Sequence, residues 1–332
     1  MTTTNSKVQV ERILSLPETI WIDAEESSPG IQAATHQSGT FWVLGRQVLL
    51  RSNDGLNWQD ASHNLRDEGS FCVVSIAHEP ACTKIFARSR NGLRCYRWDE
   101  WDRAWKPLFS VNTSSPGVFA AWTDDGLITI ASESPSTAVE CRNGDLSKSA
   151  RWRTILLGNA IHVQLASSGI GLCALWGTSE SPHESDRGPS AAYSTSDFGR
   201  SWRRIAEFDT TMLLVGTAIN HNSAIVGGTS GLIASVANDK LREVWIEQGG
   251  DIVAIDANGT TQIAVIESED QPAVQGLLLR QGDGTWVRYE ANFERRVECM
   301  KLTCLGECIV CTSNEIYRCK FNLDELETRL TT

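Results

Sequence analysis

The sequence contains no apolar run of the roughly 18–20 residues that a membrane-spanning helix needs. It also lacks a basic excess, because 41 acidic residues against 30 Lys and Arg give a formal net charge of −11 at pH 7. Nucleic acid and anionic membrane surfaces are therefore not expected as main partners. Residues 1–7 are polar and no apolar stretch follows them, so no secretion signal is visible and a cytoplasmic location is expected.

The spacing of metal ligands is missing as well. The six histidines show no His-x-x-x-His pattern. Among the ten cysteines, Cys308-x-x-Cys311 has a spacing that zinc sites use. In a β-strand, however, residues three apart point to opposite faces. We therefore expect reduced cysteines that act as small buried hydrophobes, and neither a metal nor another cofactor.

What the chain does contain is a recurring turn built from aspartate, glycine and tryptophan. The key residues of three copies are Asp54, Gly55 and Trp58, then Asp197, Gly199 and Trp202, then Asp283 and Trp286. At such a turn the Asp accepts hydrogen bonds from backbone N–H groups and the Gly adopts a positive φ, while the Trp covers the turn. Because the same acid recurs at equivalent turns, a structural role is favoured over that of catalytic carboxylates.

Two weaker signals accompany these turns. Asn91-Gly92 and Asn143-Gly144 are interpreted as degenerate copies. The stretch 98–105 carries three tryptophans, of which Trp105 is expected in the core and Trp101 at the surface.

Tryptophans at positions 58, 105, 152, 202, 245 and 286 recur at intervals of 41 to 50 residues. Repeats of this length built of short strands are typical of β-propellers. The sequence predicts an all-β, seven-bladed β-propeller of four-stranded antiparallel blades in a single domain, 1–332. The predicted blades are 30–62, 70–110, 117–158, 160–207, 211–248, 251–291, and 296–321 together with 8–14. The N-terminal strand 8–14 is expected to pair outside 316–321 and close the ring, which removes a free sheet edge.

The turn motif Thr195-Ser196-Asp197-Phe198-Gly199-Arg200-Ser201-Trp202 resembles the Asp-box, or BNR, repeat of sialidase-like and photosystem II assembly factor-like β-propellers. The resemblance implies that Asp boxes lie on the outer rim of the face opposite the ligand site. The assembly factors are lumenal and carry an export signal, so their role is not transferred to this chain.

Sialidase catalysis is not supported by the residues. Arg12-Ile13-Leu14 lacks the proline of the Arg-Ile-Pro motif that the family resemblance would require. The four tyrosines, Tyr96, Tyr193, Tyr289 and Tyr317, fall on predicted third or fourth strands. We expect none of them to have a base within hydrogen-bond reach together with access to substrate.

The connections from second to third strand and from fourth strand to the next blade emerge on one face, and two of them, 177–190 and 267–275, are long and acidic. The candidate partner-binding residues are Glu180, Glu184, Asp186, Arg187, Glu267, Glu269, Asp270, Arg46 and Arg90. This charge is either solubilising only or an acidic rim that steers a basic protein or cationic ligand.

Two functions remain open. The first is a non-catalytic scaffold that binds a protein partner, as an assembly factor, chaperone or neutraliser of a basic toxin. The alternative is a glycosidase-like or other enzyme with its site at the mouth of the central channel, since propellers host unrelated chemistries. A small-molecule ligand in the channel is compatible with either.

Overall fold

The computed structural model describes residues 8–16, 30–68, 71–79, 82–89, 92–111, 117–123, 126–132, 138–144, 153–157, 159–165, 171–176, 190–195, 201–208, 211, 213–220, 223–238, 240–268, 275–282, 284–304 and 306–321. Within them nearly all regular structure is β-strand, and the two helices are short 3₁₀ segments, η2 (His63–Glu68) and η3 (Thr229–Gly231). The described part of the chain contains no helix long and apolar enough to cross a membrane.

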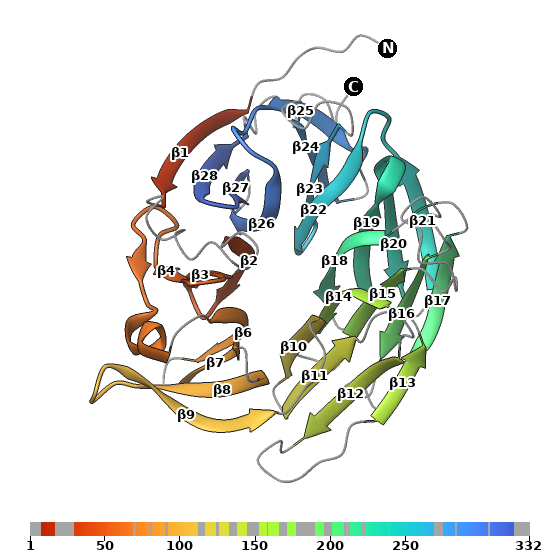
Figure 1. The fold of residues 1–332 in the computed structure, drawn as a ribbon. Coiled ribbons are helices and arrows are strands. Elements are labelled where there is room, and N and C mark those ends of the chain that lie inside the picture. The colour runs from red at the N-terminus through yellow and green to blue at the C-terminus, as the bar shows by residue number, and fades with distance from the viewer. Residues whose placement is uncertain are drawn as a thin grey trace.

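The described strands form seven antiparallel sheets of four strands each (Figure 1). The first three sheets contain β2 (Ile31–Gln37), β3 (Thr40–Gly45), β4 (Val48–Ser52) and β5 (Gln59–Asp60); β6 (Cys72–Glu79), β7 (Cys82–Ser89), β8 (Gly92–Asp99) and β9 (Ala104–Val111); and β10 (Gly117–Thr123), β11 (Gly126–Ser132), β12 (Ala138–Gly144) and β13 (Arg153–Leu157).

The next three sheets contain β14 (Asn159–Leu165), β15 (Gly171–Trp176), β16 (Ser190–Thr195) and β17 (Arg203–Phe208); β18 (Leu213–Asn220), β19 (Ser223–Gly228), β20 (Leu232–Ala237) and β21 (Lys240–Ile246); and β22 (Asp251–Asn258), β23 (Thr261–Glu267), β24 (Gln275–Gln281) and β25 (Val287–Ala291). The last sheet contains β26 (Val297–Cys304), β27 (Glu307–Thr312), β28 (Glu315–Lys320) and, at its outer edge, β1 (Gln9–Ser15). The prediction of an all-β chain built of four-stranded antiparallel sheets is confirmed.

The sheets are arranged around a common centre, with the first strand of each sheet innermost (Figure 1). Their hydrophobic cores lie between neighbouring sheets. One cluster joins the first and second sheets through Leu49 and Ile85, and another joins the fifth and sixth through Ile233 and Ile252. A middle strand is therefore apolar on both faces, and β23 is buried along nearly its whole length, as expected for strands covered on both sides.

The N-terminal strand pairs with the last sheet, as predicted. β1 runs antiparallel to β28, with Gln9 opposite Lys320 and Ser15 opposite Glu315, and the register shifts between Arg12 and Leu14. Beyond β1, the Leu16 N–H donates to the Asn314 carbonyl at 2.8 Å. The pairing uses the outer edge of β28 that would otherwise be unpaired.

Two faces are distinguished by their connections. The loop face carries the links from second to third strand and from fourth strand to the next sheet, among them 46–47, 229–231, 247–250, 292–296 and 313–314. The turn face carries the hairpins from first to second and from third to fourth strand, among them 38–39, 53–58, 100–103, 259–260 and 306.

Candidate functional site

On the loop face, the described residues form ion pairs between neighbouring strands and sheets. Glu267, at the end of β23, is 6% exposed and lies 3.2 Å from Nε of Arg296. Its other carboxylate oxygen accepts a hydrogen bond at 2.9 Å from the amide of Gln275, which also donates to the Arg295 carbonyl. Of the acidic loop-face residues singled out from the sequence, Glu267 is thus engaged within the protein and contributes to the contact between the sixth and seventh sheets.

The other candidate partner-binding residues are distributed unevenly over the described chain. Arg46 lies between β3 and β4, where its N–H donates to the Gly30 carbonyl at 3.0 Å and its backbone bridges to Cys72. The remaining candidates, Glu180, Glu184, Asp186, Arg187, Glu269, Asp270 and Arg90, lie outside the described residues. Their role in partner binding stays a prediction.

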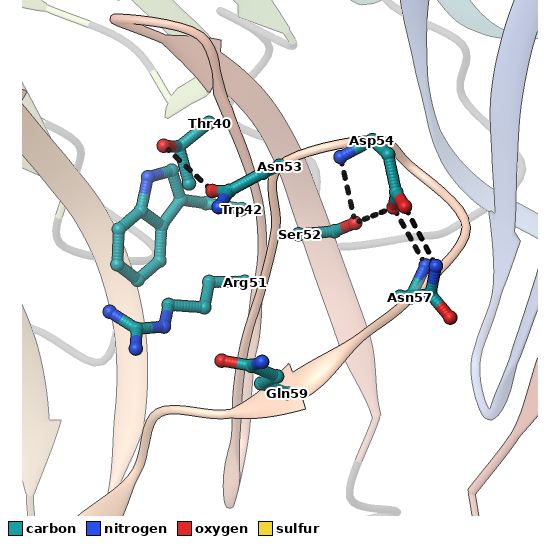
Figure 2. A pocket seen from close by; sticks show the side chains of 8 residues that line it. All are labelled: Thr40, Trp42, Arg51, Ser52, Asn53, Asp54, Asn57 and Gln59. Carbon is teal, nitrogen blue, oxygen red and sulfur yellow. Dashed lines mark hydrogen bonds between the residues drawn. The ribbon is translucent and has the colours of Figure 1, made fainter.

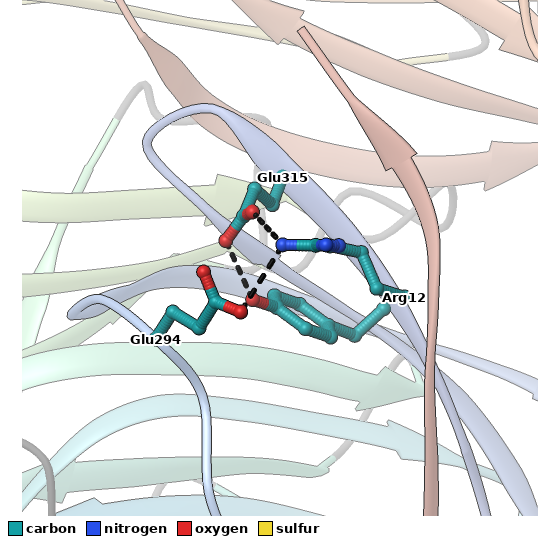
Figure 3. Close-up of polar contacts among 4 residues, drawn as sticks. Arg12, Glu294 and Glu315 are labelled. Atoms are coloured by element: carbon teal, nitrogen blue, oxygen red, sulfur yellow. Dashed lines mark hydrogen bonds and ion pairs between the residues drawn. The ribbon is translucent and has the colours of Figure 1, made fainter.

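A second loop-face network surrounds Arg12 at the outer rim (Figure 3). Arg12 Nη1 lies 2.9 Å from Glu315 and 3.1 Å from Glu294, so it joins β1 to β28 and to the link 292–296 between the sixth and last sheets. Glu315 is 5% exposed on its side chain and also accepts a hydrogen bond from the Tyr317 hydroxyl at 2.5 Å. The strand carrying Arg12 is the outermost of its sheet, as predicted.

This network includes one of the four tyrosines. All four lie on third or fourth strands as predicted, but Tyr317 does have a carboxylate within hydrogen-bond reach. Burial, followed by the hydrogen bond to Glu315, raises the pKa of Tyr317 to about 12. The phenol is only 4% exposed and stays protonated at neutral pH. Tyr317 therefore has a carboxylate partner, as a catalytic nucleophile would, but it is neither ionised nor accessible to a substrate.

On the turn face, the hydrogen bonds predicted for the turn after β4 are confirmed (Figure 2). Asp54 Oδ1 accepts from the backbone N–H groups of Leu56 at 2.9 Å and Asn57 at 2.8 Å. Gly55 has a φ of 70°, and the Trp58 indole donates to the Gly55 carbonyl at 3.2 Å. The hydrogen bonds, led by those from Asn57, hold the pKa of Asp54 well below its ordinary value of 3.8.

The second sheet carries an equivalent turn that sequence reasoning missed. Asp99 Oδ1 accepts from the N–H groups of Trp101 at 2.9 Å and Asp102 at 3.1 Å, the same pair of positions as at Asp54. Gly92, interpreted above as part of the degenerate copy, instead begins β8 next to the hairpin from β7, on the loop face. At the Asp99 turn Trp101 is 95% exposed and Trp105 is 2% exposed, which confirms both expectations.

The other turn motifs are only partly within the described residues. Trp202 is half-buried before β17, and Trp286 is 8% exposed before β25 and lies in the core shared with the fifth sheet. Asp197, Gly199 and Asp283 lie outside the described residues.

A pocket of about 260 Å³ opens beside the Asp54 turn (Figure 2). It is lined by Thr40, Trp42, Arg51, Ser52, Asn53, Asp54, Asn57 and Gln59. Three of these form a row across the first sheet, since Trp42 is opposite Arg51 and Arg51 is opposite Gln59. Trp42 belongs to the core shared with the second sheet, so the row lies on the side of the first sheet that faces the second.

Among the described residues, cysteines and acidic side chains form no set of metal ligands. Cys308 lies in the core shared with the sixth sheet and Cys311 in the core shared with the first, so these two residues point to opposite faces of β27, as predicted. Across the described ranges, no group of three or more His, Cys, Asp or Glu side chains converges as metal ligands do.

Radially arranged four-stranded antiparallel sheets with their cores between neighbours define the β-propeller fold, and this protein is a β-propeller. No protein-family model and no curated protein matches the sequence. Among solved structures, the chain is similar to YCF48 from Cyanidioschyzon merolae, at 12% identity and a TM-score of 0.63 over 95% of this chain and 99% of that one.

A structure of YCF48 bound to D1 peptide matches with a TM-score of 0.63 at 11% identity over 97% of this chain and 99% of that one. The WD40 β-propeller domain of Doa1 matches with a TM-score of 0.56 at 8% identity over 96% of this chain and 98% of that one. At these identities the likeness shows the fold alone.

Proposed function

We propose that this chain is a non-catalytic propeller scaffold that binds a protein partner through its loop face. The observation that carries the proposal is the likeness, over nearly the whole chain, to a propeller whose solved structure contains a bound peptide. Tyr317, whose hydroxyl donates to the Glu315 carboxylate, is buried and protonated at neutral pH, which argues against it as the nucleophile of the alternative, glycosidase-like chemistry.

The proposed architecture is a single domain, 1–332, with seven blades in a ring closed by the N-terminal strand. The proposed blades are 30–62, 70–110, 117–158, 160–207, 211–248, 251–291, and 296–321 with 8–14. Support comes from the core cluster that contains Ile31 and Val43 of the first sheet together with Ile309 and Ile316 of the last. The Ile31 N–H also donates to the Ser313 carbonyl at 2.9 Å. A closed ring gives a rigid platform whose loops can be specialised for binding.

The proposed partner is a basic protein. The formal net charge of −11 attracts a cationic surface, and the connections 177–190 and 267–275 would concentrate that charge on the loop face. Glu180, Glu184, Asp186, Glu269 and Asp270 would supply the acidic contacts. Arg46, Arg90 and Arg187 would set the orientation, because they interrupt the acidic rim.

Charge reversal tests this assignment. The variant Glu180→Lys, Glu184→Lys and Asp186→Lys is compared with a control, Glu11→Lys, Glu100→Lys and Glu290→Lys, which makes the same change of net charge. The three control residues are exposed and lie on outer strands or on the turn face. Proteins captured from the native source are quantified for each variant, and we expect only the loop-face variant to lose a partner that the wild type captures. Raised salt should weaken the wild-type complex, because salt screens exposed charges. Equal capture by both variants would argue against the loop face.

The proposed compartment is the cytoplasm. Its support is that Cys72, Cys82, Cys95, Cys299, Cys308, Cys311 and Cys319 are all free thiols, which suits a reducing environment. Detection of the native protein in a secreted or lumenal fraction would contradict this location.

A further inference from the structure

The pocket beside the Asp54 turn has a wall made of three different groups in direct register. The Trp42 indole, the Arg51 guanidinium and the Gln59 amide come from three neighbouring strands (Figure 2). Side chains directly opposite one another in an antiparallel sheet have Cβ atoms about 4.5–5.5 Å apart. The row therefore places a cation and a donor amide beside an aromatic wall that is only 3% exposed and held in the core.

Several hydrogen-bond acceptors of the pocket already have partners, whereas several of its donors have none among the described residues. Asp54 accepts hydrogen bonds on both carboxylate oxygens, and Asn53 Oδ1 accepts from the Thr40 hydroxyl at 3.4 Å. In contrast, the Arg51 guanidinium and the NH₂ groups of Asn53 and Gln59 have no hydrogen bond or ion pair to any described residue. The pocket thus offers donors, whereas several of its acceptors are already occupied.

We propose that this pocket binds a carboxylate group of a peptide. An ionised carboxylate is an acceptor-only group, and it matches the planar fork of an arginine. Asp54 also lines the pocket and its lowered pKa keeps it ionised, so a ligand with a single negative charge meets less repulsion there than the roughly −1.5 to −2 of a phosphate group.

The size of the pocket fits one acidic residue. A volume of about 260 Å³ holds several water molecules, which suits a side chain or a chain terminus. The site lies on the turn face and takes an acidic group, whereas the scaffold function proposed above uses the loop face and a basic partner. Either assignment can therefore fail without the other.

The test uses three small probes and two-dimensional NMR of the full-length protein. N-acetyl-glutamate N-methylamide carries a side-chain carboxylate, its glutamine counterpart is the neutral isostere, and N-acetyl-glycine carries a terminal carboxylate. We expect the carboxylate probes to shift the Trp42 indole and Arg51 side-chain N–H signals saturably, and the glutamine probe to leave them in place. Whichever carboxylate probe binds more tightly identifies the source as an acidic side chain or a C-terminus.

Arg51→Gln is expected to weaken carboxylate binding by about tenfold or more, since hydrogen bonds to charged groups are the stronger kind. Arg203→Gln, which removes an exposed arginine from β17, should leave the affinity unchanged. The remainder of the spectrum reports whether each variant stays folded. Equal binding of the glutamine probe, equal binding by Arg51→Gln, or tighter binding of inorganic phosphate would each overturn the proposal.

Discussion

At the residue scale, one carboxylate organises the turn after β4. Asp54 accepts four hydrogen bonds, from the Ser52 hydroxyl, the Leu56 and Asn57 backbones and the Asn57 amide, at 2.7 to 2.9 Å. These bonds favour the ionised form and lower its pKa below 3.8. A lowered folded pKa contributes stability that is present above the unfolded pKa and is lost as the pH falls through the folded value.

Asp54→Asn is therefore expected to lower the Tm at pH 7, because the amide keeps an acceptor oxygen but not the charge. The difference in Tm between wild type and variant should shrink as the pH is lowered below about 3.8. Thermal unfolding followed by circular dichroism across this range measures it. Glu100→Gln serves as the control, since no hydrogen bond to a described residue is recorded for this exposed carboxylate. A difference that does not change with pH would show that the charge of Asp54 has no role.

Tyr317 gives a second prediction at this scale. Its buried hydroxyl donates to Glu315, so Tyr317→Phe should lower the free energy of unfolding by about 1 kcal/mol, measured by urea denaturation. Because the folded pKa is raised to about 12 from an ordinary value of 10, this contribution is full below pH 10 and is lost as the pH rises toward 12. The absorbance change of tyrosinate should show a late-titrating phenol that Tyr317→Phe removes. Titration of all tyrosines near pH 10 would contradict the burial.

Residue types alone could identify the Asp54 turn but not its relative at Asp99. Asp54 precedes its tryptophan by four positions, whereas Asp99 precedes Trp105 by six, so a search by spacing misses it. The backbone hydrogen bonds are nevertheless the same. The row of Trp42, Arg51 and Gln59 could not be predicted from the sequence either, because these residues come together only through the register of three strands.

At the scale of the element, the last sheet brings cysteines into two directly opposite pairs. Cys299 faces Cys311 across β26 and β27, and Cys308 faces Cys319 across β27 and β28. The hydrogen bond between Cys299 and Cys311, followed by burial, raises the pKa of Cys299, while burial followed by the hydrogen bond with Cys319 raises the pKa of Cys308. A raised pKa leaves little thiolate at neutral pH, and the thiolate is the reactive form.

These thiols are therefore expected to react with Ellman's reagent only when the protein unfolds. In the native protein the partly exposed Cys82 should react first among the described cysteines, and Cys82→Ser should remove that fast phase. Kinetics in buffer and in urea, with mass mapping of the labelled peptides, measure the order. Fast native labelling of Cys308 or Cys319 would show that the last sheet opens readily.

The strands themselves were predictable because each leaves a local signal of alternation and turn residues. The partner of β1 was predictable for a different reason. The last repeat has one strand fewer than the others, so the outer edge of its third strand would be unpaired without β1. The loop-face contacts were not, because pairs such as Arg296 with Glu267 join segments 29 positions apart through the packing of neighbouring sheets. Charged residues in a connection therefore indicate which face of the molecule they lie on, whereas the packing of neighbouring sheets decides which of them form ion pairs within the protein.

At the scale of the whole molecule, burial is greatest in the middle strands of a sheet and least in its outer strand. In the sixth sheet β23 and β24 are buried almost throughout, whereas β21 of the fifth sheet is exposed along nearly its whole length. An outer strand is hydrogen-bonded on one side only, so its amides exchange through local opening. The first described strand, β1, occupies one such outer position and lies beside β28, the last described strand (Figure 1).

Hydrogen exchange followed by mass spectrometry should therefore show the slowest exchange in β23, β24 and β27 and the fastest, among described strands, in β21. If the proposed ring closure holds, β1 should be protected to about the level of the covalently continuous outer strands, because Val8 and Leu16 anchor its two ends in the cores. The variant Val8→Ala with Leu16→Ala should speed exchange in β1 and β28 while leaving β21 unchanged. Exchange of β1 in the wild type far faster than that of β21 would mean that the N-terminal strand does not close the ring in solution.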